Sequence, residues 1–372
     1  MNYQIPTLPL VIDVETKAVL RQLSAAHRKL AELKGVALTI PNENILINTL
    51  ILQEAKDSSE VENIVTTHDE LYKAELNMET LSISASTKEV INYVEATKYG
   101  FELIRKNKIL TNNYIIEIQQ RLEKNTAGFR SNHGTTLQNQ AGDVVYTPPQ
   151  NKKDIEMYMD NLQVFINEDS ISDLDSLIKM AIIHHQFESI HPFYDGNGRT
   201  GRIINILYIV MNDLLDLPIL YLSRYIILNK LEYYRRLQAV RDKNDWEGWI
   251  LFILKGVEET ANQTIHLVKG ISKLIQDYKI IIRSSLKKVY SHELINNLFS
   301  YPYTKIDFVM KDVGVSRITA ANYLEELVKE NLLEKEKHGR DNYYLNLPLI
   351  ELLMQGSPQI SQKTEQIESI NE

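Results

Sequence analysis

Residues 191–202, with the sequence HPFYDGNGRTGR, bring a base, a carboxylate, glycines and two arginines into one short stretch of chain. His191 can act as a general base at neutral pH. Asp195 is an acid beside a site suited to anions, where it can hold a Mg²⁺ ion that bridges phosphate oxygens. These residue types indicate chemistry on phosphate groups, in which positioning and charge neutralisation dominate.

The centre of this stretch predicts an anion site. Gly196 and Gly198 flank Asn197 and permit backbone angles that turn successive N–H groups towards one point. A helix expected to start near Arg199 adds its own unpaired N–H groups and the positive end of its dipole. Arg199 and Arg202 are three residues apart, so both guanidinium groups can face this site. Each feature alone is usually structural, but their occurrence together favours phosphoryl or nucleotidyl transfer.

The same residues resemble the Fic-domain signature H-x-F-x-[DE]-G-N-G-R-x-x-R, which HPFYDGNGRTGR matches at every fixed position. The resemblance implies a nucleotidyltransferase that moves AMP from ATP to a Ser, Thr or Tyr hydroxyl of a target protein. It implies that His191 deprotonates the target hydroxyl, that Asp195 holds Mg²⁺ and that Gly201 is also a close-packing position. The residues that it assigns to ATP and phosphate binding are Gly196, Asn197, Gly198, Arg199, Thr200, Gly201 and Arg202.

The resemblance extends to both sides of the motif. Residues 128–149 are similar to the hairpin flap of the family, which binds an extended target segment by strand addition. The candidate target-docking residues in this flap are Gly128, Arg130, Val144 and Tyr146. Tyr233 and Tyr234 fall where relatives stack an aromatic ring near the adenine, and packing in the core is the alternative for this pair.

Residues 58–63, SSEVEN, resemble the inhibitory pattern [ST]-x-x-x-E-[GN], which one class of the family carries upstream of its core. Ser58 and Glu62 are the fixed residues of this pattern. The resemblance implies autoinhibition by a salt bridge from Glu62 to Arg202, which occupies the guanidinium that the γ-phosphate needs. Ser59 and Glu62 also have the spacing of a helix capping box, and the two interpretations are compatible. In some relatives this glutamate also serves the removal of AMP, and the sequence leaves that reaction open here.

Helices must position these residues. Apolar residues recur at helical spacing in segments 15–33, 87–107, 111–122, 153–165, 174–189 and 203–215. Asp13 or Thr16 is expected to cap the first helix and Gly35 to end it. Between residues 128 and 149 the helical period lapses and glycines appear, which predicts a β-hairpin. The expected fold is therefore mainly α, a Fic-type helical bundle with a β-hairpin flap.

The C-terminal part predicts a separate unit. Residues 305–313 and 316–330 have the pattern of two helices separated by Gly314, and an alternating stretch around a glycine turn follows. This order is typical of a winged helix-turn-helix. Between residues 291 and 350 seven Lys and Arg stand against nine Asp and Glu. Since DNA-binding modules usually carry a basic surface, DNA binding is possible but not favoured over protein–protein contact or homodimerisation.

Composition limits the remaining possibilities. The chain of 372 residues has a net charge of −8 and no cysteine, which excludes disulfides and a thiol nucleophile. No signal peptide is recognisable, and the longest apolar stretch, residues 203–222, is interrupted by polar residues and Pro218. We expect a soluble, cytoplasmic protein without membrane contact.

The expected domains are an N-terminal helical region with the inhibitory motif at 1–108, a catalytic core at 109–265, a connecting helix at 266–290, a winged helix-turn-helix at 291–350 and a polar tail at 351–372. A nucleotide-sensing winged-helix transcriptional regulator is the main alternative function, and an interaction scaffold with a degenerate core is another. The intact His191 argues against both, because binding alone requires no base.

Overall fold

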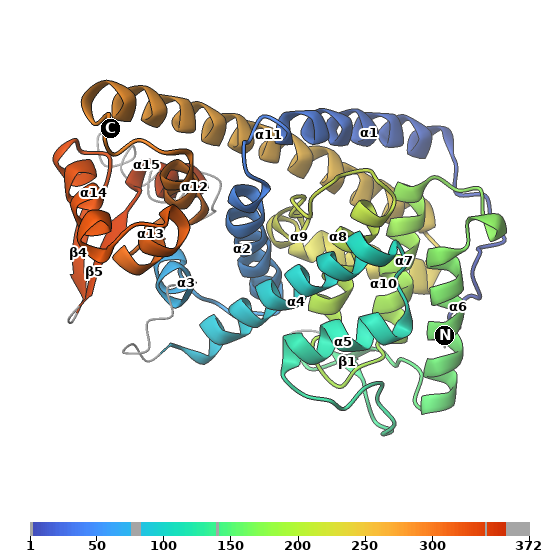
Figure 1. The fold of residues 1–372 in the computed structure, drawn as a ribbon. Coiled ribbons are helices and arrows are strands. Elements are labelled where there is room, and N and C mark those ends of the chain that lie inside the picture. The colour runs from blue at the N-terminus through green and yellow to red at the C-terminus, as the bar shows by residue number, and fades with distance from the viewer. Residues whose placement is uncertain (1–2, 76–82, 139–140, 339–340, 355–372) are drawn as a thin grey trace, which may run out of the picture.

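The computed structural model describes residues 3–75, 83–138, 141–338 and 341–354, and helices dominate it, as the sequence predicted (Figure 1). The N-terminal helices are α1 (Lys17–Ala37), α2 (Glu43–Val61), α3 (His68–Glu75) and α4 (Ala85–Asn107). Thr16 caps α1, as expected, because its side chain accepts the N–H of Val19. The prediction that Gly35 ends this helix is wrong. The helix continues to Ala37, and along its length it packs against α11 (Trp246–Ser285).

The central part of the chain forms the helical body that carries the motif. Its helices are α5 (Asn112–Glu123), α6 (Lys152–Asn167), α7 (Ser176–Ile190), α8 (Asn197–Met211), α9 (Ser223–Leu228) and α10 (Lys230–Lys243), with a 3₁₀ turn at Asp169–Ile171. Every residue of α7 from Leu177 onward is buried, as expected for a helix at the centre of a bundle. Because α7 and α8 pack against each other, the loop that joins them is held at the end of the pair.

The hairpin expected between residues 128 and 149 is present in a short form. Strand β1 (Leu137–Gln138) pairs antiparallel with β2 (Val144–Tyr146), with Leu137 opposite Tyr146 and Gln138 opposite Val144. The register shifts between the two residues of β1. The long loops on either side of these strands connect the hairpin to α5 and α6.

The C-terminal unit follows the 40-residue helix α11, which runs along the top of the view in Figure 1. Its elements are α12 (His292–Ser300), β3 (Tyr303–Thr304), α13 (Ile306–Val313), α14 (Arg317–Lys329), β4 (Glu334–His338), β5 (Asp341–Leu345) and α15 (Leu347–Met354). The strands form one antiparallel sheet in the order β3-β5-β4. The two predicted helices are present, and Gly314 between them has φ 72° and ends α13.

Two of the expected domain limits fall inside helices. The limit between residues 265 and 266 lies inside the continuous helix α11. Of the expected polar tail at 351–372, residues 351–354 belong to α15 and the rest lies outside the described residues.

Helix α2 lies between the two halves of the molecule (Figure 1). It packs against α4 and α9 on the side of the helical body and against α12 on the side of the C-terminal unit. Tyr303 on β3 also donates a hydrogen bond to Asp69 on α3, at 2.9 Å. The helix that carries residues 58–61 is therefore part of the core rather than an appended segment.

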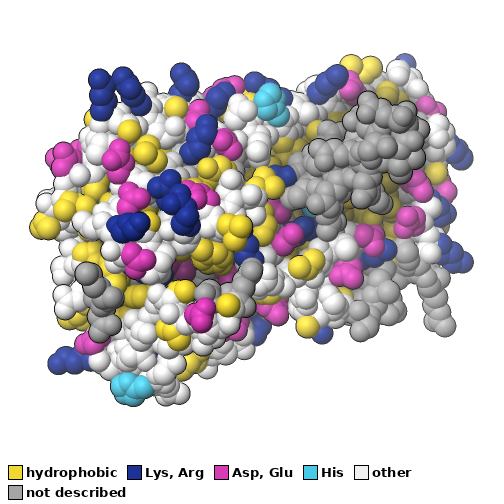
Figure 2. All heavy atoms as spheres, turned by 180° about the vertical axis from the view of Figure 1, so that it is seen from behind, with side chains coloured by type: hydrophobic (Ala, Val, Ile, Leu, Met, Phe, Trp, Pro, Cys, Tyr) yellow, Lys and Arg dark blue, Asp and Glu magenta, His cyan; other side chains and the backbone are white. Residues whose placement is uncertain are grey.

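The surface carries charges of both signs. On the face opposite to that of Figure 1, Lys and Arg side chains are interspersed with Asp and Glu wherever side chains are described (Figure 2). Within the described ranges, none of the helices combines the length and apolarity that crossing a membrane requires.

Candidate active site

The loop between α7 and α8 is shaped by the side chain of Asn197. Its Oδ1 accepts the N–H of Phe193 and its Nδ2 donates to the carbonyl of the same residue, both at 2.8 Å. Gly196 precedes the helix with φ 73°, in the left-handed region that glycine adopts without strain. The first N–H groups of α8 therefore open onto this loop without partners inside the helix. The amide group of Asn197 thus fixes the shape of the loop, and its part in phosphate binding stays a prediction from the resemblance.

His191 lies at the C-terminal end of α7, where its backbone has φ 51° and its N–H donates to the carbonyl of Phe187. Burial, together with the positive charges of Arg130 and Arg241, lowers the pKa of His191 to about 4. The imidazole is therefore neutral at pH 7. A neutral imidazole can accept a proton, which is the state that a general base requires.

Arg130 and Tyr146 hold the hairpin against the end of α7. The buried guanidinium of Arg130 donates to the carbonyls of His191 and Pro149. The hydroxyl of Tyr146 donates to the carbonyl of Ser189 at 2.9 Å. Neither side chain faces a target, because both are buried. Among the candidate docking residues, Val144 is exposed, and Gly128 has φ 68° in the loop before the hairpin.

Asp195 lies at the exposed rim of the loop. Its Oδ1 accepts the N–H of Gly196 at 2.7 Å, and its backbone carbonyl accepts a hydrogen bond from Gln119 on α5. Among the described residues, no group of three or more His, Asp or Glu could hold a metal ion by itself. This donor set fits Mg²⁺, which commonly takes one or two carboxylates and completes its shell with water and substrate phosphates.

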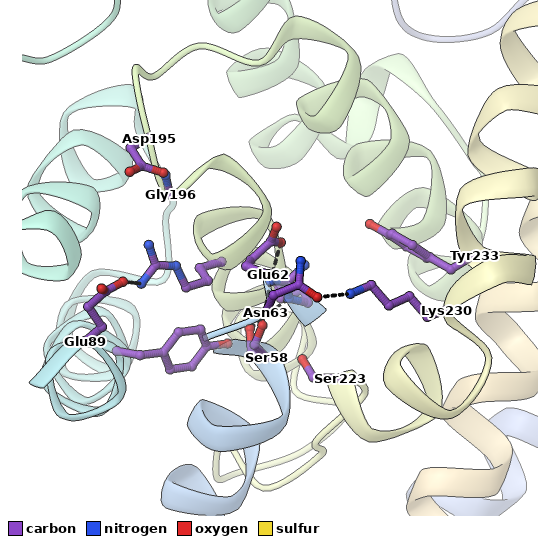
Figure 3. Close-up of polar contacts among 12 residues, drawn as sticks. Ser58, Glu62, Asn63, Glu89, Asp195, Gly196, Ser223, Lys230 and Tyr233 are labelled. Carbon is purple, nitrogen blue, oxygen red and sulfur yellow. Dashed lines mark hydrogen bonds and ion pairs between the residues drawn. The ribbon is translucent and has the colours of Figure 1, made fainter. Parts of the chain in front are cut away.

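Arg202 on α8 is buried and bound to the end of α2, where Figure 3 labels Ser58 and Glu62. Its Nη2 contacts Oε1 of Glu62 at 2.8 Å, and its Nε donates to Oγ of Ser58 at 2.7 Å. Burial opposes ionisation of Glu62, but Arg202 outweighs it and, with Arg199 and Lys230, holds the pKa of the carboxyl below its ordinary value. Glu62 and Arg202 therefore form a charged pair, with the geometry that the inhibitory pattern implies.

Glu62 ends α2 rather than starting a helix. It is the C-cap of α2, so the capping-box interpretation of Ser59 and Glu62, which needs a helix N-terminus, is wrong. The next residue, Asn63, has φ 63°, and its side chain accepts a hydrogen bond from Lys230 at 2.9 Å. Lys230 on α10 thus ties the end of α2 to the opposite wall of the site (Figure 3).

The Glu62 carboxylate also covers the start of α8. A Cβ atom added to Gly198 would lie 2.2 Å from Oε1 of Glu62, so glycine is required for this close approach. A carboxylate at the N-terminus of a helix is held by the helix dipole and by unpaired N–H groups, as a phosphate would be. The Glu62 carboxylate therefore lies directly against the first turn of α8.

Arg199 points to a different pair of carboxylates. Its Nη1 donates to Glu89 on α4 at 3.0 Å, and its Nη2 donates to Glu123 on α5 at 2.8 Å. The arginine side chain is 3% exposed. Arg199 and Arg202 are thus each paired with carboxylates from other helices, and a common phosphate site for the two arginines stays a prediction.

The other candidate residues lie around α7 and α8. Thr200 is buried, and Gly201 packs against α7, where an added Cβ would lie 2.9 Å from Oε1 of Glu188. Tyr233 is buried in an aromatic cluster, and its hydroxyl pairs with Nε2 of His184 at 2.9 Å. Tyr234 is 45% exposed beside it. The packing alternative thus describes Tyr233, and only Tyr234 faces solvent.

Sequence reasoning did not identify the residues that hold the motif from outside it. Glu89, Gln119, Glu123 and Lys230 come from helices that are distant in sequence, and no spacing rule connects them with residues 191–202. A carboxylate at the end of a predicted helix, such as Glu123, is ordinarily a solvated surface residue. The packing of α4 and α5 against α8, and the hydrogen bond from α10 to the end of α2, bring these side chains to the site.

Three family models match consecutive parts of the chain. Residues 20–102 match the Fic/DOC family N-terminal model, residues 109–209 the Fic/DOC family model, and residues 274–349 the C-terminal domain of protein adenylyltransferase SoFic-like proteins. A protein adenylyltransferase Fic of Nematostella vectensis is 27% identical over 175 residues, which is 47% of this chain and 39% of that protein. A probable protein adenylyltransferase of Aquifex aeolicus is 29% identical over 190 residues, which is 48% of this chain and 54% of that protein. The chain thus aligns with only about a third to a half of these curated relatives.

Solved structures agree on the fold. A Fic family protein from Desulfovibrio desulfuricans superposes with a TM-score of 0.58 at 18% identity and covers 91% of this chain and 97% of its own. Fic-1 from C. elegans gives a TM-score of 0.51 at 19% identity and covers 66% of this chain and 72% of its own. The motif at the α7–α8 junction and the three consecutive matches of family models show that the chain belongs to the Fic/DOC family.

Proposed function

We propose that this protein transfers AMP from ATP to a hydroxyl group of a target protein, and that Glu62 restrains the reaction in the resting state. The observation that carries the proposal is the arrangement at the start of α8. A neutral histidine, an exposed carboxylate and a helix N-terminus converge there, and a carboxylate from α2 occupies the anion site. Relatives named protein adenylyltransferase support the same reaction class.

In the proposed reaction, the target hydroxyl oxygen attacks the α-phosphorus of ATP. The bond from that phosphorus to the oxygen bridging to the β-phosphate breaks, pyrophosphate leaves, and His191 accepts the hydroxyl proton. The unpaired N–H groups at the start of α8 stabilise charge on the phosphate oxygens. Asp195 would hold a Mg²⁺ ion, which would neutralise negative charge on the phosphates of ATP. Tyr234 is the candidate aromatic contact for the adenine.

Restraint follows from competition for Arg202. A γ-phosphate needs a guanidinium in order to bind in line for the reaction, and Arg202 is already paired with Glu62 and Ser58. With Glu62 in place, its negative charge repels the phosphate tail and excludes it from the space over Gly198. ATP then binds without the orientation that transfer requires.

The hairpin is the proposed docking site for the target. Val144 on β2 is 55% exposed, and the short pairing of β1 with β2 leaves room for an added strand. Arg130 and Tyr146 serve this role indirectly, because they fix the base of the hairpin to the carbonyl groups near His191. A target hydroxyl on such an added strand would approach His191.

The test uses ATP labelled at the α-phosphate, Mg²⁺ and a lysate, with the Glu62→Gly variant. Protein-bound label is expected, and it should be absent with ATP labelled at the γ-phosphate, because the leaving pyrophosphate carries that label away. Label from the γ-phosphate would indicate kinase chemistry instead. The absence of protein label from either nucleotide, combined with tight DNA binding at physiological salt, would favour the transcriptional regulator.

Removing the Lys230 contact should weaken the restraint without abolishing it. Lys230→Ala deletes the hydrogen bond to Asn63 and a positive charge near Glu62. We expect transfer to rise by about twofold to fivefold, the range of one partly exposed hydrogen bond. Initial rates of labelling measure the effect, and Lys243→Ala at the other end of the same helix is the control. An unchanged rate would show that Lys230 has no part in holding α2.

A further inference from the structure

Glu123 lies outside the motif, yet it contacts two of the motif's residues. Its Oε1 accepts a hydrogen bond from Nη2 of Arg199 at 2.8 Å. The same oxygen would lie 2.3 Å from a Cβ added to Gly196, so the carboxylate packs directly on the backbone of the anion site. Glu123 is the last residue of α5, where the helix dipole disfavours a negative charge. Its placement therefore depends on Arg199 rather than on its own helix.

Arg199 is held from two sides, and one of its three guanidinium nitrogens has no partner among the described residues. Glu89 and Glu123 take Nη1 and Nη2, which fixes the plane of the guanidinium between α4 and α5. The third nitrogen, Nε, is buried and has no hydrogen-bond partner among the described residues. A buried donor without an acceptor is unfavourable unless a ligand supplies one. Figure 3 shows Glu89 on the side of the site away from Lys230 and below Asp195 and Gly196.

We propose that Glu123 is a positioning residue for the phosphate site, which holds Arg199 so that its free Nε donor can meet a phosphate oxygen of ATP. Glu89 assists from the more exposed side, with a side chain that is 42% exposed against 12% for Glu123. The neighbouring residue of α5 on the same face, Gln119, holds the carbonyl of Asp195. Helix α5 thus fixes both Arg199 and the loop that carries Asp195.

The contrary possibility is that Glu123 competes with phosphate for Arg199, as Glu62 does for Arg202. The two roles predict opposite effects of removing the carboxylate. If Glu123 positions Arg199, its loss weakens ATP binding; if it competes, its loss strengthens ATP binding and transfer. The two pairs differ in structure. Arg202 donates hydrogen bonds to Ser58 and Glu62 at the end of α2, whereas Nε of Arg199 has no hydrogen-bond partner among the described residues.

The experiment measures MgATP binding by calorimetry and transfer kinetics in the Glu62→Gly background, in which Arg202 is available. Glu123→Ala is expected to raise the Kd and the KM for ATP by about tenfold or more, as for one lost charge-assisted hydrogen bond, with a smaller change in kcat. Glu123→Gln keeps an oxygen acceptor and should recover most of the affinity. Glu95→Ala is the matched control. Glu95 lies on α4 and is paired with Lys124, the residue that follows Glu123, so the variant removes an exposed carboxylate close to the site that does not contact Arg199.

Several outcomes would overturn the positioning role. These are an unchanged or lower Kd in Glu123→Ala, a higher rate of transfer, or a Glu123→Gln variant no better than alanine. Thermal unfolding identifies a variant that fails to fold, and Glu89→Ala, at the more exposed partner, then provides the same comparison with a smaller expected rise in Kd. The inference rests on the proposed function, but the two can fail separately. If Glu62→Gly binds MgATP without labelling protein, AMP transfer is contradicted while the Kd comparison still tests Glu123.

Discussion

Replacing Glu62 by glycine is expected to raise the rate of AMP transfer by about tenfold to a hundredfold, the range of a hydrogen bond to a charged group worth about 1.5–3 kcal/mol. The substitution removes the carboxylate from Arg202 and clears the space over Gly198. Arg202 keeps its two contacts with Ser58, so the guanidinium remains ordered for the γ-phosphate. The backbone should tolerate the change, because Glu62 is the C-cap of α2 with φ −89°.

The measurement is the initial rate at which label from the α-phosphate of ATP is incorporated into protein at saturating ATP. This rate is compared with that of the unmodified chain. Glu60→Gly is the matched control. It removes the same charge from the same turn of α2 and breaks only the ion pair with Lys56. We expect that control to leave the rate close to that of the unmodified chain. Equal rates in Glu62→Gly and Glu60→Gly would show that Glu62 merely ends the helix.

The buried position of α2 bears on how the restraint can be relieved. Nearly every residue of this helix from Ile45 to Val61 is buried, and it contacts both α9 and α12. Displacing the whole helix would expose a large apolar surface, at about 25 cal/mol for each Å². A rotation of the Glu62 side chain at the exposed end of the helix requires far less free energy, because it leaves the apolar contacts of α2 in place. Contacts of the C-terminal unit with α2 and α3 provide a route by which events there can shift this balance.

The sequence predicted those parts of the site that short spacing controls. His191 and Asp195 lie close together because only four positions separate them in the sequence. Gly196 directly precedes α8, as its freedom to adopt positive φ indicated. The pair of Glu62 and Arg202, 140 residues apart, was found through the resemblance and not through any physical rule. Arg199 shows the limit of spacing arguments. Its interval from Arg202 allows a common site, but a buried guanidinium turns to nearby carboxylates, and those lie on α4 and α5.

The fold was predictable where local signals are strong. Thr16 caps α1 and Gly314 ends α13, because these residues satisfy the backbone directly. Helix α8 begins at Asn197, before the predicted start near Arg199. The first turn of α8 is polar, so it has no apolar residues at helical spacing that would predict a helix. Its arginines are buried because they form ion pairs with residues of other helices, which the sequence does not reveal. Gly35 failed as a stop signal because packing of α1 against α11 extends the helix.

Replacing His191 should abolish transfer while ATP remains bound. In the Glu62→Gly background we expect His191→Ala to lower the rate by at least about 100-fold, the usual contribution of a general base. The imidazole is neutral at pH 7, with a pKa of about 4, so it can take the proton of the target hydroxyl. His191 lies outside the first turn of α8, whose N–H groups are the proposed donors to phosphate. The Kd for MgATP should therefore stay within about threefold of that of the Glu62→Gly variant.

A second variant separates the imidazole from its backbone. His191 has φ 51°, a left-handed conformation that strains alanine but suits asparagine. His191→Asn therefore preserves the end of α7 and the contact of Arg130 with the 191 carbonyl, and it removes only the base. Both variants should be inactive, whereas His266→Ala on the exposed side of α11 should be unaffected. Activity in His191→Asn would mean that residue 191 acts through the shape of the loop, and another group would then have to receive the proton.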